Sequence, residues 1–260
     1  MRELPIRFAD CTWEEVASLA RDAVLILPVG STEPHGPHLP LATDVIISEG
    51  MALRAARMLR ERALASLVLP PIFYSVTDFA AGFAGAVSIG FDTARAVLVD
   101  VVTSLAGQGF CRFCVANSHL EPAHVDSIAA AVTQASEATG VAIAFPDKRR
   151  RRWAARLGEE FLSGACHAGR YESSLVMAER PELVDDAVRR DLPDVPISLS
   201  EAIRDGRATF REAGGDRAYF GQPAAASSEE GEALYAALAR MLLISIRETY
   251  QLDERLSDID

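Results

Sequence analysis

The chain has 260 residues, is 49% hydrophobic and carries a formal net charge of −11. That length and apolar content suffice for one large core, so we expect a single domain spanning residues 1–260. The acidic charge argues against nucleic acid or an anionic membrane surface as partner, and no apolar run reaches the roughly 18 residues of a membrane span.

Short apolar runs alternate with longer helical patterns along the chain. In chain order, we expect a strand at 22–30, a helix at 45–64, a strand at 66–74, a helix at 92–109, a strand at 110–117, a helix at 122–140, a strand at 141–146, and helices at about 149–163, 172–180 and 227–251. Residues 193–226 are rich in turn residues and are expected to be irregular. This alternation predicts an α/β fold in which a mainly parallel sheet has helices on both faces.

Two helix starts have recognisable capping residues. Asp92 or Thr93 is expected to cap the helix at 92–109, and Ser227 and Glu230 form a Ser-x-x-Glu capping box before the last helix. The basic run DKRRRRW at 147–153 is a local exception to the acidic balance, and we interpret it as a solvated helix start or a subunit contact.

The N-terminus and the cysteines favour a cytoplasmic location. The first residues, MRELPIRFADCTWEEV, lack the apolar core of a signal peptide, so we expect none. The cysteines are only four, which is typical of a reducing compartment. Cys111 and Cys114 form a C-x-x-C motif within a predicted strand. Residues three apart on a strand point to opposite faces, so we do not expect these two to share a metal or a disulfide.

All five histidines lie in three short segments. STEPHGPH carries His35 and His38, NSHLEPAH carries His119 and His124, and CHAGRYESS carries His167. The first two segments follow predicted strands. In open parallel sheets, the loops beyond the carboxyl ends of the strands converge on one crevice. We therefore expect these segments to meet at a single site.

Carboxylates accompany the histidines at a spacing that suits a metal site. Glu33 and His35 are two residues apart, as are His119 and Glu121, and such pairs project to the same side of an extended stretch. Asp44 follows just before a predicted helix, and its two oxygens could bridge two ions. Mixed carboxylate and imidazole ligands suit zinc or manganese. A single pair of this kind is common in polar turns, but two pairs placed after two strands favour a metal site.

The third segment adds two candidate residues. His167 could donate a proton to a leaving nitrogen beside a metal centre, and Glu172 could orient a ligand or complete the coordination shell. A solvent-exposed histidine and a glutamate favoured by the dipole at a helix start are equally compatible with this segment. We expect His38 to support the structure or a ligand, and His124 to lie in the first turn of a helix.

The run LPVGSTEPHGPHLPLATD resembles the signature of the creatininase family of metal-dependent hydrolases. The resemblance recurs in the family's order at FAGAVSIG (83–90), VANSHLEPA (115–123), HAGRYESSLV (167–176) and GQPAAASSEEGE (221–232). It implies a three-layer α/β/α sandwich with a mainly parallel central sheet, and a homo-oligomer, namely a hexamer. It also implies two divalent metal ions per subunit, Zn, Mn or Fe.

Matched by position, the resemblance also assigns roles to individual residues. The implied metal ligands are Glu33, His35, Asp44 (bridging), His119 and Glu121. His167 matches the family's acid/base histidine, and Glu172 matches its glutamate in the Glu-Ser-Ser element.

Several positions depart from the family's pattern. HLEP keeps a carboxylate where many members have His-Gly-Gly-Asn, and Ala84-Gly85-Ala86 replaces the usual Pro-Gly-Thr. Creatininase packs its substrate between tryptophans. This chain has only Trp13 and Trp153, and Ser163 stands where a tryptophan would be expected. Creatinine is therefore not the expected substrate.

The sequence predicts an amidohydrolase that cleaves a C–N bond other than a peptide bond in a small-molecule cyclic amide, lactam or formamide. Two metal ions would activate a water, Glu121 would help handle its proton, and His167 would protonate the leaving nitrogen. Two alternatives stay open. One is a peptidase acting on a small modified peptide, as in the mycofactocin branch of the family, and the other is a non-catalytic metal-binding scaffold protein.

Overall fold

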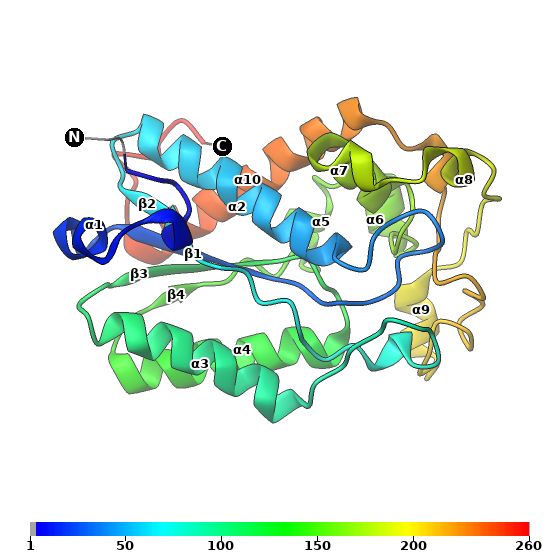
Figure 1. Ribbon diagram of the computed structural model, residues 1–260, viewed down its shortest axis with the longest axis horizontal. Helices are drawn as coiled ribbons and strands as arrows, with labels where there is room; N and C mark the ends of the chain where they lie inside the picture. The colour runs from blue at the N-terminus through cyan, green and yellow to red at the C-terminus, as the bar shows by residue number, and fades with distance from the viewer. Residues whose placement is uncertain (1–3, 260) are drawn as a thin grey trace.

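The computed structural model describes residues 4–259, which form an α/β fold in three layers (Figure 1). The middle layer is a parallel four-stranded sheet with the order β2-β1-β3-β4. Its strands are β1 (Val24–Val29), β2 (Ser66–Val68), β3 (Arg112–Asn117) and β4 (Ile143–Ala144). The prediction of a parallel sheet between helices is confirmed.

Long helices cover both faces of the sheet (Figure 1). One face carries α2 (Thr43–Glu61), α7 (Arg170–Glu179) and α10 (Ser228–Tyr250), and the other carries α3 (Phe91–Ala106) and α4 (Pro122–Thr139). Shorter elements are η1 (Phe8–Asp10), α1 (Trp13–Ser18), η2 (Asp78–Ala80), α5 (Arg151–Ala154), α6 (Glu159–Ser163), η3 (Pro181–Leu183), α8 (Asp186–Arg190), α9 (Leu199–Arg204) and η4 (Pro223–Ala225). None of the helices within residues 4–259 is both long and apolar enough to cross a membrane.

Successive side chains of β1 point to opposite faces of the sheet, so the hydrophobic core consists of two clusters, one on each face. Val24 and Ile26 of β1 pack into the cluster formed with α2 and α10, whereas Leu25 and Leu27 pack into the cluster formed with α3 and α4. Successive strand residues point to opposite faces, so an apolar run of this kind can serve both layers.

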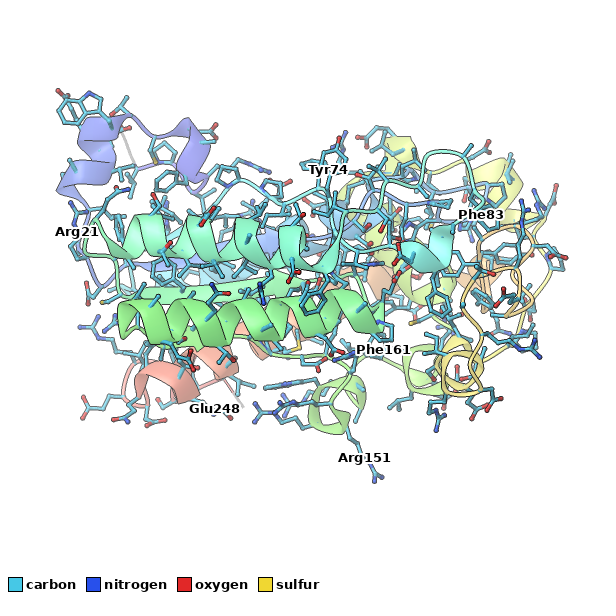
Figure 2. All side chains as sticks on the ribbon, turned by 90° about the horizontal axis from the view of Figure 1, so that it is seen from below. Arg21, Tyr74, Phe83, Arg151, Phe161 and Glu248 are labelled. Atoms are coloured by element: carbon cyan, nitrogen blue, oxygen red, sulfur yellow. The ribbon has the colours of Figure 1, made fainter. Side chains whose placement is uncertain are left out.

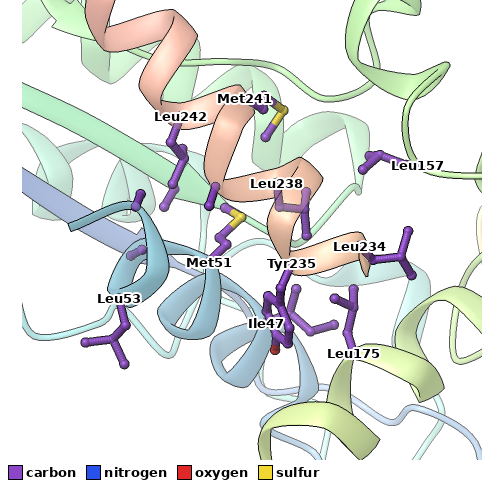
Figure 3. Packing of buried hydrophobic residues seen from close by; sticks show 14 of the residues in the cluster. Ile47, Met51, Leu53, Leu157, Leu175, Leu234, Tyr235, Leu238, Met241 and Leu242 are labelled. Carbon is purple, nitrogen blue, oxygen red and sulfur yellow. The ribbon is translucent and has the colours of Figure 1, made fainter. Parts of the chain in front are cut away.

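The larger cluster joins three helices. Figure 3 shows Ile47 and Met51 from α2, Leu175 from α7, and Tyr235 and Leu238 from α10 gathered together. Because α2 and α7 both begin at the carboxyl end of the sheet, this packing sets the relative positions of the residues at their first turns.

Most expected elements differ from the observed ones by a few residues at their ends, and four differences matter more. The single helix expected at 149–163 is two short helices, α5 and α6, separated by Gly158 at φ +90°. The strand expected at 66–74 ends at Val68, because Pro70 and Pro71 have no N–H to donate to a neighbouring strand. Helix α3 begins at Phe91 with Gly90 as its cap, so neither Asp92 nor Thr93 caps it. The stretch 193–226 contains α9 and η4.

Ser174 of α7 takes part in the N-terminal cap of α10. Ser227 Oγ accepts the backbone N–H of Glu230 at 3.2 Å, as the Ser-x-x-Glu pattern predicts. The reciprocal bond of a capping box is replaced, because the Ser227 N–H donates to Ser174 Oγ at 3.1 Å, and Ser174 Oγ donates to Glu230 Oε2 at 3.3 Å. The cap therefore ties the start of α10 to α7.

Gly231 lets α10 lie directly against α7, and its replacement tests that contact. A Cβ at Gly231 would lie 1.9 Å from the Ser174 carbonyl oxygen. We expect Gly231→Ala to lower the free energy of unfolding by about 1–3 kcal/mol, as overpacking does, although alanine is intrinsically the better helix former. Urea unfolding measures the change. Gly90→Ala is the control, because its Cβ would meet no atom within 4 Å. Equal loss in both variants, or no loss at Gly231, would contradict the close packing.

Candidate metal centre

Three segments bring the predicted residues together at the carboxyl end of the sheet. Glu33 and His35 lie in the loop after β1, and Asp44 lies in the first turn of α2. His119 follows β3, and Glu172 lies in the first turn of α7. All five side chains are buried, and the convergence predicted from the strand–loop pattern is present.

Close backbone contact places Asp44 under the end of β1. A Cβ on Gly30 would lie 2.7 Å from the Val45 nitrogen and 2.9 Å from the Asp44 Cβ. Only glycine therefore lets the chain leave β1 so close to the start of α2. The loop between them is closed by the Glu33 N–H, which donates to the Leu41 carbonyl at 3.1 Å. This closure holds Glu33 and Asp44 on the same side of the sheet edge.

Backbone carbonyls fix which nitrogen of each histidine faces the centre. His35 Nδ1 lies 3.1 Å from the Glu33 carbonyl oxygen, His119 Nε2 lies 2.9 Å from that of Val76, and His167 Nε2 lies 3.1 Å from that of Pro34. A carbonyl oxygen can only accept, so each of these nitrogens carries a proton. When a ring is neutral, its opposite nitrogen (His35 Nε2, His119 Nδ1 or His167 Nδ1) holds the lone pair, which is how metal-binding histidines are oriented.

Asp44 lies between two groups of potential ligands. One group is Glu33, Asp44 and His119, and the other is His35, Asp44 and Glu172; within each, the potential ligand atoms lie within 4.8 Å of one another. Asp44 Oδ2 is 3.1 Å from His119 Nδ1, and Asp44 Oδ1 is 3.5 Å from His35 Nε2. Each oxygen of one carboxylate thus faces a different histidine, which is the arrangement that a residue bridging two cations requires.

Two atoms of the centre lack hydrogen-bond partners. His35 Nε2 and Asp44 Oδ2 are buried and make no hydrogen bond within the described part of the chain. Buried polar atoms are nearly always satisfied, because leaving one unpaired costs about 1–3 kcal/mol. The mixed nitrogen and oxygen donors suit zinc or manganese. The residues present therefore fit a pair of divalent cations.

The pKa values of the clustered residues in the metal-free protein also fit a site for cations. Burial would lower the pKa of His35, but the carboxylates of Asp44, Glu172 and Glu33 outweigh it and raise that pKa to about 10. His119 has its pKa raised well above the usual value, because Glu33 and Asp44 outweigh burial. Burial raises the pKa of Glu172 to about 7. Without a metal, protons on the histidines balance the negative charge of the carboxylates.

Glu121 and Glu172 differ from their predicted roles in their distance from the other potential ligands. Glu121 lies outside the ligand groups, and its carboxylate accepts the N–H groups of Asp78 at 3.1 Å and Phe79 at 3.2 Å. Its Oε2 is 3.9 Å from His119 Nε2, the nitrogen turned away from Asp44. Glu172 Oε2, in contrast, is 3.5 Å from His35 Nε2. The distances favour Glu172 over Glu121 as the fifth ligand.

His167 lies beside the centre against an aromatic wall. Its ring stacks on Phe210 with centroids 4.2 Å apart, and it lies 4.5 Å from the ring of His35. Nδ1 of His167 is 3.9 Å from Glu33 Oε1. Burial and the neighbouring His35 lower the pKa of His167 to about 4, so its ring is neutral at pH 7.

The two remaining histidines support the surrounding structure. His38 is buried, and its Nε2 lies 2.8 Å from Ser173 Oγ. His124 Nε2 lies 2.8 Å from Asn117 Oδ1, and its ring centroid is 4.7 Å from that of His119. Asn117 in turn accepts the His119 N–H at 3.1 Å and donates to the His119 carbonyl at 2.6 Å. Neither His38 nor His124 belongs to a group of potential ligands.

The carboxylates form the floor of a cavity of about 410 Å³. Its floor includes Glu33, Asp44, His119, Glu121, His167 and Glu172, and its walls include Phe79, Leu120, Phe161, Leu162, Leu199, Ile203 and Phe210. Neither tryptophan lines it, because Trp153 packs in the core and Trp13 is exposed. Phe79 and Phe210 were not predicted as site residues, since no local pattern distinguishes them from core aromatics.

The basic run at 147–153 is a solvated helix start, as predicted, because residues 149–152 are exposed and α5 begins at Arg151. Part of the run also lines this cavity, which the sequence did not indicate. Lys148 is buried, with its Nζ 3.5 Å from the Tyr171 hydroxyl oxygen, and burial lowers its pKa. Arg149 and Arg151 line the cavity. Burial of Lys148 and the contact of Arg149 and Arg151 with the cavity are tertiary effects that the charge pattern did not reveal.

The C-x-x-C cysteines do not form a site, as predicted. Cys114 is buried and Cys111 is exposed, and both thiols are free. Cys111 lies just before β3, where its Sγ contacts the Arg21 carbonyl oxygen at 3.4 Å.

Comparisons with known proteins agree with the predicted resemblance. The family model for creatininase, described as creatinine amidohydrolase, matches residues 9–246. A mycofactocin precursor peptide peptidase from Mycolicibacterium smegmatis is 30% identical over 220 residues, which cover 82% of this chain and 80% of that protein. A creatinine amidohydrolase from Pseudomonas putida is 31% identical over 193 residues, which cover 68% of this chain and 72% of that protein.

Solved structures share the fold. A creatininase described with Mn has a TM-score of 0.73 at 23% identity, covering 94% of this chain and 98% of that one. A mutant creatininase of a Zn-Zn type has a TM-score of 0.68 at 23% identity, covering 95% of this chain and 98% of that one.

Metal binding should release protons from the histidines. The carboxylates raise the pKa of His35 to about 10 and that of His119 well above its usual value, and a ligating histidine must be neutral. At about pH 7, loading the metal-free protein with Zn²⁺ should release about two protons per chain from these rings. The release should fall as the pH rises towards 10, where His35 has already lost its proton. Titration in weakly buffered solution with an indicator dye measures it; release of less than one proton near pH 7 would contradict the charge balance.

Proposed function

The chain belongs to the creatininase family of hydrolases, and from this premise we propose that it is a metal-dependent amidohydrolase. Its substrate is a small molecule with a C–N bond in an amide, lactam or formamide. The observation that carries the proposal is the position of Asp44, whose two oxygens face His119 and His35 at 3.1 and 3.5 Å. A carboxylate whose two oxygens face two different imidazoles is placed to be shared by two ions.

The proposed ligands are Glu33, Asp44 and His119 for one ion, and His35, Asp44 and Glu172 for the other. This set keeps four of the predicted ligands and takes Glu172 as the fifth. When bound, two divalent ions polarise a carbonyl oxygen and lower the pKa of a bound water towards neutrality. Zn and Mn are the proposed metals, because nitrogen and oxygen donors are mixed.

His167 is proposed to carry the proton to the leaving nitrogen. The Pro34 carbonyl accepts its Nε2–H, so Nδ1 is the atom that can take up and give away a proton. Burial keeps its pKa low, at about 4, and this favours a ring that passes a proton on over one that retains it. Phe210 stacks on the ring and prevents it from turning.

Glu121 is proposed to act beside the ions as a proton-handling group. It lines the cavity floor, and burial raises its pKa. The N–H groups of Asp78 and Phe79 hold its carboxylate. A carboxyl group held in this way can accept the proton of the attacking water without leaving its position.

A second candidate function is a peptidase acting on a short modified peptide. The observation that favours it is the likeness to mycofactocin precursor peptide peptidases, 30% identical over 82% of this chain. The departure at HLEP and the apolar walls of the cavity favour a small amide. A non-catalytic scaffold is the least favoured alternative, because every carboxylate and imidazole of the proposed set is buried at one point.

The assembly and location stay proposals. A homohexamer in the cytoplasm agrees with the family resemblance, and the four cysteines are free, as thiols are in a reducing compartment.

Activity on a defined panel tests the reaction. We expect the protein to lose hydrolysis on chelation and to regain it with Zn²⁺ or Mn²⁺, on a panel of lactams, cyclic amides, formamides and short peptides. Glu33→Gln should lower kcat by at least about a hundredfold, since it removes a ligand and disturbs the metal that drives the reaction. Product formation followed by mass spectrometry measures it. Cleavage of peptides alone would favour the peptidase. Full activity of Glu33→Gln would contradict the proposed metal-dependent mechanism.

Metal content separates the roles of the two glutamates. We expect Glu172→Gln to lose one of two bound ions, because its carboxylate faces His35 Nε2, and Glu121→Gln to retain both ions while losing activity. Elemental analysis after dialysis gives the number of ions per chain, with the wild-type protein treated in parallel. Loss of an ion from Glu121→Gln together with two ions in Glu172→Gln would restore the ligand set predicted from the sequence.

A further inference from the structure

We propose that the substrate carries a carboxylate group, which Arg149 binds at the mouth of the cavity while the scissile amide lies at the metal centre. This inference rests on the proposed function and adds the class of substrate to it. Arg149 lies in the loop between β4 and α5 and lines the same cavity as the metal-binding residues. With Arg151, it supplies the cationic side chains in a cavity whose floor is acidic.

Asp147 holds Arg149 in a fixed orientation. Arg149 Nε and Nη2 each donate to the Asp147 carboxylate at 3.0 Å, and the Arg149 backbone N–H donates to Asp147 Oδ1 at 3.0 Å. Asp126 of α4 lies 3.8 Å from Nη2. A guanidinium held along one edge has lost most of its rotamer freedom before any ligand arrives, so binding costs less conformational entropy.

The opposite edge of this guanidinium stays available. Nη1 of Arg149 makes no hydrogen bond to any of residues 4–259, and the side chain is 36% exposed. Its N–H groups can therefore donate to a carboxylate that enters the mouth, forming the charge-assisted pair for which arginine is well shaped.

The wall between floor and mouth is apolar. Phe161 and Leu162 of α6 face the same cavity as Leu199 and Ile203 of α9, and Leu162 is exposed. A substrate that fills the cavity thus meets acidic, proposed metal-binding residues, apolar side chains and a cationic side chain. An amide with an apolar body and a terminal carboxylate matches all three.

Arg149 is a better candidate for this role than its neighbours. Lys148 is buried beneath the site beside Tyr171, and Arg152 pairs with Glu248 of α10 at 2.9 Å. Arg151 lines the cavity, but Figure 2 shows its side chain extended away from the ribbon into solvent. Arg150 is exposed and does not line the cavity, so it provides a matched control within the same basic run.

The test uses metal-binding probes that differ only at their far end. Hydroxamates chelate zinc, so the monohydroxamates of succinic, adipic and suberic acid would each be compared with the same molecule bearing a carboxamide in place of the free carboxylate. Dissociation constants would be measured by calorimetry on the zinc-loaded protein. At one chain length or more, we expect the carboxylate probe to bind tighter by about tenfold or more, the scale of a charge-assisted pair.

Variants assign that preference to a residue. Arg149→Met should abolish the preference without changing the affinity of the carboxamide probe, which also shows that the fold and the metal centre are intact. Arg150→Met should retain the preference. Equal affinity of carboxylate and carboxamide at every length in the wild-type protein, or a preference that survives Arg149→Met, would overturn the inference and leave the metal centre standing. If no hydroxamate binds the zinc-loaded protein, the proposed metal centre fails, and the inference fails with it.

Discussion

The site depends on one carboxylate placed between two imidazoles. Asp44 can occupy this position because Gly30 lets β1 end against the first turn of α2, where any Cβ would collide with the Asp44 and Val45 backbone. The two histidines reach it from different loops, His35 from beyond β1 and His119 from beyond β3. Buried like charges repel strongly at this distance in a medium of low dielectric constant, so the carboxylates can be close together only with protons or cations among them. Protons on His35 and His119 meet that requirement in the metal-free protein, and the proposed ions would take their place.

Much of this arrangement could be predicted from the sequence. Apolar runs that end in a glycine or an asparagine marked the strands, and the parallel sheet brought the loops after β1 and β3 together. The i, i+2 spacing identified Glu33 and His35, and both lie at the centre. The same spacing also selected Glu121, which lines the cavity and accepts N–H groups from η2; its place among the ligands stays a prediction. Spacing gives the direction of a side chain only in regular extended backbone, and the residues between β3 and α4 are irregular.

Other features depend on tertiary contacts that no local pattern encodes. Helices α5 and α6 were expected as one helix, and Arg149, in the loop before α5, lines the cavity. Phe210 contacts His167 from a stretch expected only to be irregular, where its N–H donates to the Phe79 carbonyl at 2.9 Å. Lys148 belongs to a charged run that is typical of a solvated surface, yet it is buried beside Tyr171. The walls of the cavity were therefore less predictable than its floor, where the proposed metal ligands lie.

Anomalous diffraction from crystals of the Mn²⁺- or Zn²⁺-loaded protein tests the central claim most directly. A carboxylate that bridges two ions predicts two anomalous peaks about 3.5–4 Å apart, one on each side of Asp44, with the first among Glu33, Asp44 and His119 and the second among His35, Asp44 and Glu172. A single peak, or two peaks that do not share Asp44, would contradict the account.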